Sequence, residues 1–195
     1  MTGWIILTLF VASQVGTPGP ANISLMAHSA RFGVRASLPF FFGVVLGKQL
    51  IIWPIGFGLM TLLETYPIAA GVLQAASILY LLFIAWRIAN MSITQKDDAN
   101  RLSFWMGLPV HPLNPKACAM IVAAFTTFLP QGVGQFQGVL AVAVILLIVQ
   151  LVLQAFWMVF GGALARMVVG TSGERLFFRG MAIVMVLSVA IAVLI

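Results

Sequence analysis

The chain has 195 residues, of which 62% are hydrophobic and only 7% are charged, and its mean hydropathy is +1.12. A soluble domain carries about 25% charged residues, so this composition excludes a water-soluble globular protein and indicates one buried in lipid. The net charge of +6 comes from ten scattered basic residues rather than from a basic run, which argues against nucleic acid as a partner.

Long apolar runs rich in Gly and Ala predict membrane-spanning helices rather than the short alternating strands of a barrel. A span needs about 20 apolar residues, and we predict an all-α integral membrane protein with one transmembrane domain over 1–195. The first segment carries no basic residue before Arg31, whereas a secretory signal begins with basic residues; we expect it to be retained. The six predicted spans are about 4–27, 38–63, 68–86, 104–129, 138–165 and 176–195.

The first span contains QVGTPGPANIS at 14–24, with two prolines and two glycines within five residues. Both residue types are unfavourable inside a helix, so a break is predicted. Thr is a common N-cap and Pro is favoured at the first helical position. We therefore predict that Thr17 caps a helix restarting at Pro18, with Gly19 allowing close backbone approach. His28, near the end of this span, is expected to be solvated.

The second span contains Lys48, which directly follows Gly43-Val-Val-Leu-Gly47. Two glycines four residues apart favour close packing against another helix. Lys48 is 13 residues from Arg35, which is roughly 20 Å along a helix and too far for its ammonium group to reach the membrane surface. We therefore favour a contact with a substrate carboxylate, or a gating role, over a side chain that only extends towards water.

The fourth span contains a second break, HPLNPKACAM at 111–120. Asn114 precedes Pro115 as Thr17 precedes Pro18. Asn is also a preferred N-cap residue, so the same signals predict a second cap and a second restart.

The two breaks are 97 residues apart, about half the chain length. This offset indicates a duplication, with repeat one at about 1–95 and repeat two at about 100–195. Three spans in each repeat turn the second copy over in the bilayer, as in many transporters. We therefore predict six transmembrane helices in two inverted three-helix repeats, with broken first and fourth helices.

Two restarted helices that enter from opposite sides would bring their N-termini together. Each N-terminus carries free N–H groups and about half a positive charge, which suits an anion such as a carboxylate, and Lys116 adds a full charge. The alternative is a pair of structural proline kinks, which are common in membrane helices. The predicted substrate-binding residues are Thr17, Pro18, Gly19, Pro20, Asn22, Asn114, Pro115 and Lys116.

Four further polar residues are candidates for the transport path or its coupling to an ion. Gln150 and Gln154, in the fifth span, share one helix face and either line the path or bond to neighbouring helices. His111 either relays a proton or packs as a neutral ring. These path or coupling candidates are Lys48, His111, Gln150 and Gln154.

The acidic residues Glu64, Asp97, Asp98 and Glu174 all lie away from the middle of a span. Proton coupling would therefore need His111 or a lysine rather than a buried carboxylate. The sequence holds no Ser-His-Asp set, no metal-ligand cluster and no phosphate-binding loop. We predict no enzyme activity, no catalytic residue, no cofactor and no metal site.

The basic residues outside the membrane all fall in the first, third and fifth connections. If there are six spans, these connections share one side of the membrane. The positive-inside rule then places that side in the cytoplasm and both termini outside. The residues are Arg31, Arg35, Arg87, Lys96, Arg101, Arg166, Arg175 and Arg179.

Three stretches resemble the LysE/RhtB family of bacterial amino-acid exporters: GTPGPAN, ARFGVRASLPFFFGVVLG and FWMGLPVHPLNPKACA. The resemblance runs in order from the first span to the fourth and fits the chain length and the six-span layout. It implies export of an amino acid or a close derivative across the inner membrane, driven by the proton motive force. The positions that match the family motifs are Thr17, Pro18, Gly19, Pro20, Asn22, Asn114, Pro115 and Lys116.

Three positions depart from the family pattern. Ala21 stands where Asn is frequent, Lys48 where Asp or an apolar residue is common, and His111 where Gln is common. A change from Asp to Lys disfavours a cationic substrate side chain. The resemblance and this departure together imply a neutral or acidic amino acid rather than lysine or arginine.

The expected partners are an amino-acid substrate, the lipid bilayer and, if transport is proton-coupled, protons. Small-residue helix faces are also compatible with a homodimer. The alternative function is a passive channel or a non-transporting membrane scaffold, although a scaffold would need neither matched breaks nor an intramembrane lysine.

Overall fold

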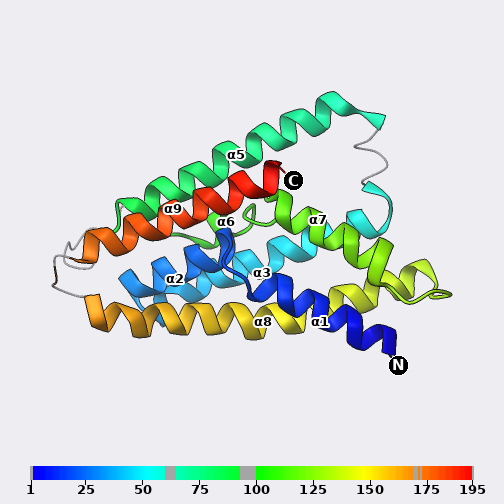
Figure 1. Ribbon diagram of the computed structural model, residues 1–195, viewed down its shortest axis with the longest axis horizontal. Coiled ribbons are helices and arrows are strands. Elements are labelled where there is room, and N and C mark those ends of the chain that lie inside the picture. The colour runs from blue at the N-terminus through cyan, green and yellow to red at the C-terminus, as the bar shows by residue number, and fades with distance from the viewer. Residues whose placement is uncertain (1, 60–64, 93–99, 169–170, 172, 195) are drawn as a thin grey trace.

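The computed structural model describes residues 2–59, 65–92, 100–168, 171 and 173–194, which form helices with short connections and contain no strand (Figure 1). Three helical segments are long and apolar enough to cross a membrane: Val34–Gly56, Ile68–Ala89 and Gln135–Leu164. The predicted all-helical architecture with membrane helices is confirmed for these residues.

The first predicted span consists of two helices, α1 (Thr2–Gly16) and α2 (Pro20–Phe32), so the predicted break is present. The predicted cap is wrong: Gly19 is the N-cap and Pro20 is the first helical residue. The reason lies in the second proline, because the ring of Pro20 disfavours helical geometry at the residue before it. Gly19 is therefore held extended, and no helix can begin at Pro18.

The second break has the predicted form. Helix α6 (Phe104–Gly107) is followed by turns, and α7 (Pro115–Ala123) continues into the π-helical turn η1 (Ala124–Phe128). Asn114 is the N-cap of α7, and its Oδ1 accepts a hydrogen bond from the Lys116 backbone N–H at 3.1 Å.

The remaining elements are the long helices α3 (Val34–Gly56), α5 (Pro67–Ala89), α8 (Gln135–Val168) and α9 (Gly173–Leu194). Helix α8 packs against α1, α2 and α3, while α5 and α9 lie side by side (Figure 1). One hydrophobic cluster joins α2, α3, α5 and α9, and a second joins α1, α3, α7 and α8. The break between α1 and α2 therefore lies where the two clusters meet.

Glycines let several helices approach at backbone distance. Gly43 and Gly47 of α3 lie against the carbonyl groups of Phe104 and Leu108, so a Cβ at either position would overlap an oxygen. This confirms the close packing that their four-residue spacing predicts. The turn between α2 and α3 is also formed by a glycine, Gly33, at φ 83°, where side-chain-bearing residues are strained.

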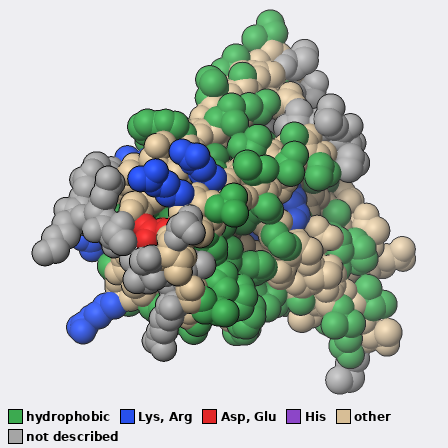
Figure 2. Space-filling model, turned by 60° about the vertical axis from the view of Figure 1, so that its left-hand side comes forward, with side chains coloured by type: hydrophobic (Ala, Val, Ile, Leu, Met, Phe, Trp, Pro, Cys, Tyr) green, Lys and Arg blue, Asp and Glu red, His purple; other side chains and the backbone are tan. Residues whose placement is uncertain are grey.

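The arginine side chains that the structure describes gather at one end of the molecule, which we call the basic end: Arg31, Arg35, Arg87, Arg101, Arg175 and Arg179. They belong to the end of α2, the start of α3, the end of α5, the segment before α6 and the start of α9, and Figure 2 shows Lys and Arg side chains gathered on one side. The N-terminus of α1 lies at the opposite end (Figure 1). Lys96 and the Arg166 side chain lie outside the described residues, as do Glu64, Asp97 and Asp98.

Candidate functional site

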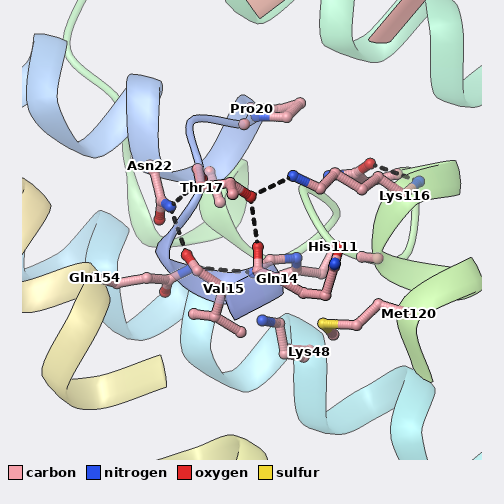
Figure 3. A pocket seen from close by; sticks show the side chains of 14 residues that line it. Gln14, Val15, Thr17, Pro20, Asn22, Lys48, His111, Lys116, Met120 and Gln154 are labelled. Carbon is pink, nitrogen blue, oxygen red and sulfur yellow. Dashed lines mark hydrogen bonds between the residues drawn. The ribbon is translucent and has the colours of Figure 1, made fainter. Parts of the chain in front are cut away.

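A polar cavity of about 40 Å³ lies where α2 and α7 begin, which is room for a few water molecules. Its walls come from α1, α2, α3, α7, α8 and the turn before α7 (Figure 3). The cavity brings together nine of the twelve residues that the sequence singles out: Thr17, Gly19, Pro20, Asn22, Lys48, His111, Asn114, Lys116 and Gln154. Pro18, Pro115 and Gln150 are not part of its lining.

The two helix starts meet through Lys116 and Thr17. Lys116 Nζ donates to Thr17 Oγ1 at 2.6 Å, and the Thr17 hydroxyl donates to the Gln14 carbonyl at 2.8 Å. A Cβ at Gly19 would stand 3.8 Å from Lys116 Nζ. The ammonium group of α7 therefore lies directly beside the N-cap of α2.

The two N-termini differ in how their backbone N–H groups are satisfied. In α7, the Asn114 side chain accepts from Lys116, and its carbonyl accepts from Ala117. In α2, the cap is a glycine, which has no side chain to contribute. The N–H groups of Ala21 and Asn22 therefore have no acceptor among the residues that the structure describes. Of the two ends, α2 is the one with N–H groups available to a ligand.

Asn22 ties the two halves of the first span together. Its Nδ2 donates to the carbonyls of Val15 at 2.7 Å and Thr17 at 2.9 Å, near the end of α1 (Figure 3). Its Oδ1 is buried and has no described partner. The Asn22 amide nitrogen therefore holds the helix break together, and its oxygen is left without a described donor.

Lys48 reaches the cavity from α3 and is only 2% exposed. None of the described residues accepts a hydrogen bond from its ammonium nitrogen. The one carboxylate that the structure describes, Glu174, is in α9 and accepts from Ser92 at 2.7 Å. Because a buried ammonium group is stable only with an anionic or polar partner, the cavity favours a negatively charged ligand.

His111, Gln150 and Gln154 form one buried cluster, of which His111 and Gln154 line the cavity. His111 Nε2 lies 3.3 Å from Gln150 Nε2 and 3.2 Å from Gln154 Nε2, and Gln150 Nε2 also donates to Gln154 Oε1 at 3.0 Å. With Nε2 accepting from amides, a neutral ring carries its proton on Nδ1. Within the described chain, neither His111 Nδ1 nor Gln150 Oε1 has a hydrogen-bond partner. Gln150 thus belongs to the site through His111 although it does not line the cavity.

Several lining residues were not predicted: Gln14, Val15, Ala21, Ala117 and Met120. The helical repeat contains a signal for one of them, because Met120 lies four residues after Lys116 on the same face of α7. The expected solvation of His28 is wrong, since the side chain is 0% exposed. Its Nδ1 forms a hydrogen bond with Ser37 Oγ at 2.7 Å, and its ring packs against Phe32 and Phe40, away from the cavity.

Comparison with known proteins gives a family match over nearly the whole chain. The family model described as LysE type translocator matches residues 12–195. Cysteine/O-acetylserine efflux proteins from Escherichia coli (strain K12) and Shigella flexneri are each 32% identical over 118 residues, which is 59% of this chain and 60% of each relative. The chain thus spans less than two thirds of the length of these relatives. No solved structure shows a significant match.

Proposed function

Because the chain belongs to the LysE type translocator family, we propose that it exports a small amino acid or a close derivative across the bacterial inner membrane as a secondary transporter. Membership of a translocator family confirms the prediction that the chain is not an enzyme. The observation that carries the proposal is the meeting of two interrupted helices at a partly open cavity lined by two lysines.

The proposed topology is six spans in two inverted three-helix repeats. Two sets of contacts agree with it: α1 lies against α8 as α6 lies against α3, and α5 lies against α9. The packing is not equivalent throughout, because α2 packs far more extensively on α8 than its counterpart α7 does on α3. The basic end faces the cytoplasm in this proposal, because basic residues are retained on that side. Both termini then lie on the periplasmic side, and the cavity lies within the bilayer, where broken helices place substrate sites in many transporters.

In the proposed binding mode, the substrate carboxylate lies at the N-terminus of α2. The free N–H groups of Ala21 and Asn22 and the Lys116 ammonium group converge there. The partial positive charges of the N–H groups and the full charge of Lys116 repel one another, and an anion bound between them offsets this repulsion. The unpartnered Oδ1 of Asn22 is the acceptor that we assign to the substrate's amino group.

The proposed substrate has a neutral or acidic side chain. A cationic side chain would meet Lys48, which has no described carboxylate to offset it. The similarity to efflux proteins named for cysteine and O-acetylserine agrees with a small neutral substrate.

Proton coupling is the second part of the proposal. The cavity offers His111, Lys48 and Lys116 as carriers, and no carboxylate among the described residues. Of the three, only His111 contacts two side-chain amides. A change in the protonation of its ring would change the hydrogen bonds that these amides make.

Transport in everted membrane vesicles tests the proposal. Vesicles containing the protein should accumulate radiolabelled cysteine, O-acetylserine or an acidic amino acid, and collapse of the proton gradient should end the accumulation. Lys116→Ala should insert normally and lose transport, whereas Arg175→Ala, at an exposed site on the basic end, should keep it. Preference for lysine over neutral amino acids would overturn the substrate assignment, and equilibration without accumulation would indicate a passive channel.

A further inference from the structure

A groove of about 430 Å³ lies between α5 and α9, separate from the polar cavity. Its wall is formed by apolar side chains and one cation, Arg179. Ile183 and Leu187 of α9 and Leu82 of α5 are 59%, 55% and 42% exposed along it. Such a surface meets lipid in a membrane protein, and the exposed side chain of Arg179 borders it at the basic end.

The charge lies at one end of the groove. Arg179 is six residues past the start of α9, roughly 9 Å along its axis, and the last residue of α5, Ala89, lines the same end. Trp86 beside them is 61% exposed, as aromatic residues are at the level of lipid headgroups. The groove is thus cationic near the basic end and apolar towards the membrane centre.

We propose that this groove binds one anionic glycerophospholipid. The headgroup phosphate accepts from the Arg179 guanidinium group, and the first part of an acyl chain lies along the apolar wall. Basic pockets between transmembrane helices bind anionic headgroups in this way. The basic end supplies a positive field that favours an anionic lipid over a zwitterionic one (Figure 2).

A second copy of the chain fits the groove less well. In a two-fold dimer the same surface meets itself, so two copies of Arg179 would approach each other at an apolar interface. The structure places no carboxylate in the groove wall to offset them. A buried, unpaired charge of this kind is destabilising, whereas a lipid phosphate neutralises it.

Native mass spectrometry of the purified full chain tests the proposal with two lipids of identical acyl chains, phosphatidylglycerol and phosphatidylcholine. One phosphatidylglycerol should be retained more strongly than phosphatidylcholine. Arg179→Gln should weaken its retention about five-fold, the effect of one basic residue at a membrane surface. Arg175→Gln, one turn away and outside the groove wall, is the matched control and should leave retention unchanged.

A second measurement does not depend on Arg179. Phosphatidylglycerol with brominated acyl chains should quench the fluorescence of Trp86, and Trp86→Phe should remove that quenched component. Equal retention of the two lipids, equal loss in Arg175→Gln and Arg179→Gln, or absence of Trp86 quenching would overturn the proposal. Efficient cross-linking of the Ile183→Cys variant into a lipid-free dimer would also overturn it, because the occupant would then be a second copy.

Discussion

Lys116 Nζ and Thr17 Oγ1 lie 2.6 Å apart although the residues are separated by 99 positions in the chain. This contact joins the start of α7 to the break that precedes α2. It places the formal charge from one half of the chain at the open helix end of the other half. The site therefore exists only when both halves are folded against each other.

Thr17→Val should impair transport, because it removes the hydroxyl that accepts from Lys116 while keeping the side-chain shape. Because this contact is exposed to solvent, its contribution is that of an ordinary hydrogen bond, about 0.5–1.5 kcal/mol, so we expect a loss of roughly two- to ten-fold in initial rate. Thr126→Val is the control, since Thr126 is exposed in η1 and donates to Val122 at 3.0 Å, far from the cavity wall. Equal rates for the two variants would exclude a role for the Thr17 hydroxyl.

Lys48→Met should make the protein more stable and less active. The substitution removes a buried ammonium group that has no described acceptor and keeps a long apolar side chain. Replacing buried charge by well-packed apolar groups stabilises proteins by about 1–4 kcal/mol in favourable cases. Thermal unfolding in detergent should show a higher midpoint, with transport reduced in vesicles. A lower midpoint would mean that Lys48 has a stabilising partner.

His111→Gln should uncouple transport from protons. Glutamine retains hydrogen bonding to Gln150 and Gln154 but cannot carry a proton at neutral pH. We expect exchange of labelled for unlabelled substrate to persist, while accumulation driven by a pH gradient disappears. His28→Gln is the comparison, because the sequence has two histidines and His28 is buried outside the cavity. If His111→Gln still accumulates substrate in response to a pH gradient, a lysine rather than His111 carries the proton.

Gly161→Ala should destabilise the packing of α8 on α2. A Cβ at Gly161 would overlap the Met26 carbonyl and crowd the Ser29 hydroxyl at 2.6 Å, and overpacking of this kind costs about 1–3 kcal/mol. Gly180→Ala is the matched control in α9, where no atom lies within 4 Å. There, alanine should be neutral or stabilising by up to about 1 kcal/mol. Similar unfolding midpoints for both variants would contradict the close α2–α8 contact.

Local sequence signals predict both helix breaks, because Pro, Gly and the Asn114 cap act through the backbone within a few residues. The position of the cap in the first break depends on how Pro18 and Pro20 compete, and the Thr-Pro pair alone does not reveal it. The burial of His28 depends on its contacts with Ser37 and Phe40 of α3, which no local pattern encodes. The partners of His111 likewise come from another helix, so the sequence could identify the residue but leave its role open.

Because α2 and α7 have different N-caps, the two helix starts at the cavity differ in the N–H groups that they offer to a ligand. A ligand with one acidic end would settle with that end towards Ala21 and Asn22, because Asn114 already occupies the corresponding positions of α7. If the carboxylate and the amino group of a chiral amino acid are both held in place, its side chain can point in only one direction. The side chains of the two enantiomers would thus contact different walls of the cavity. The choice between them would follow from the Gly19 cap of α2, where α7 has Asn114.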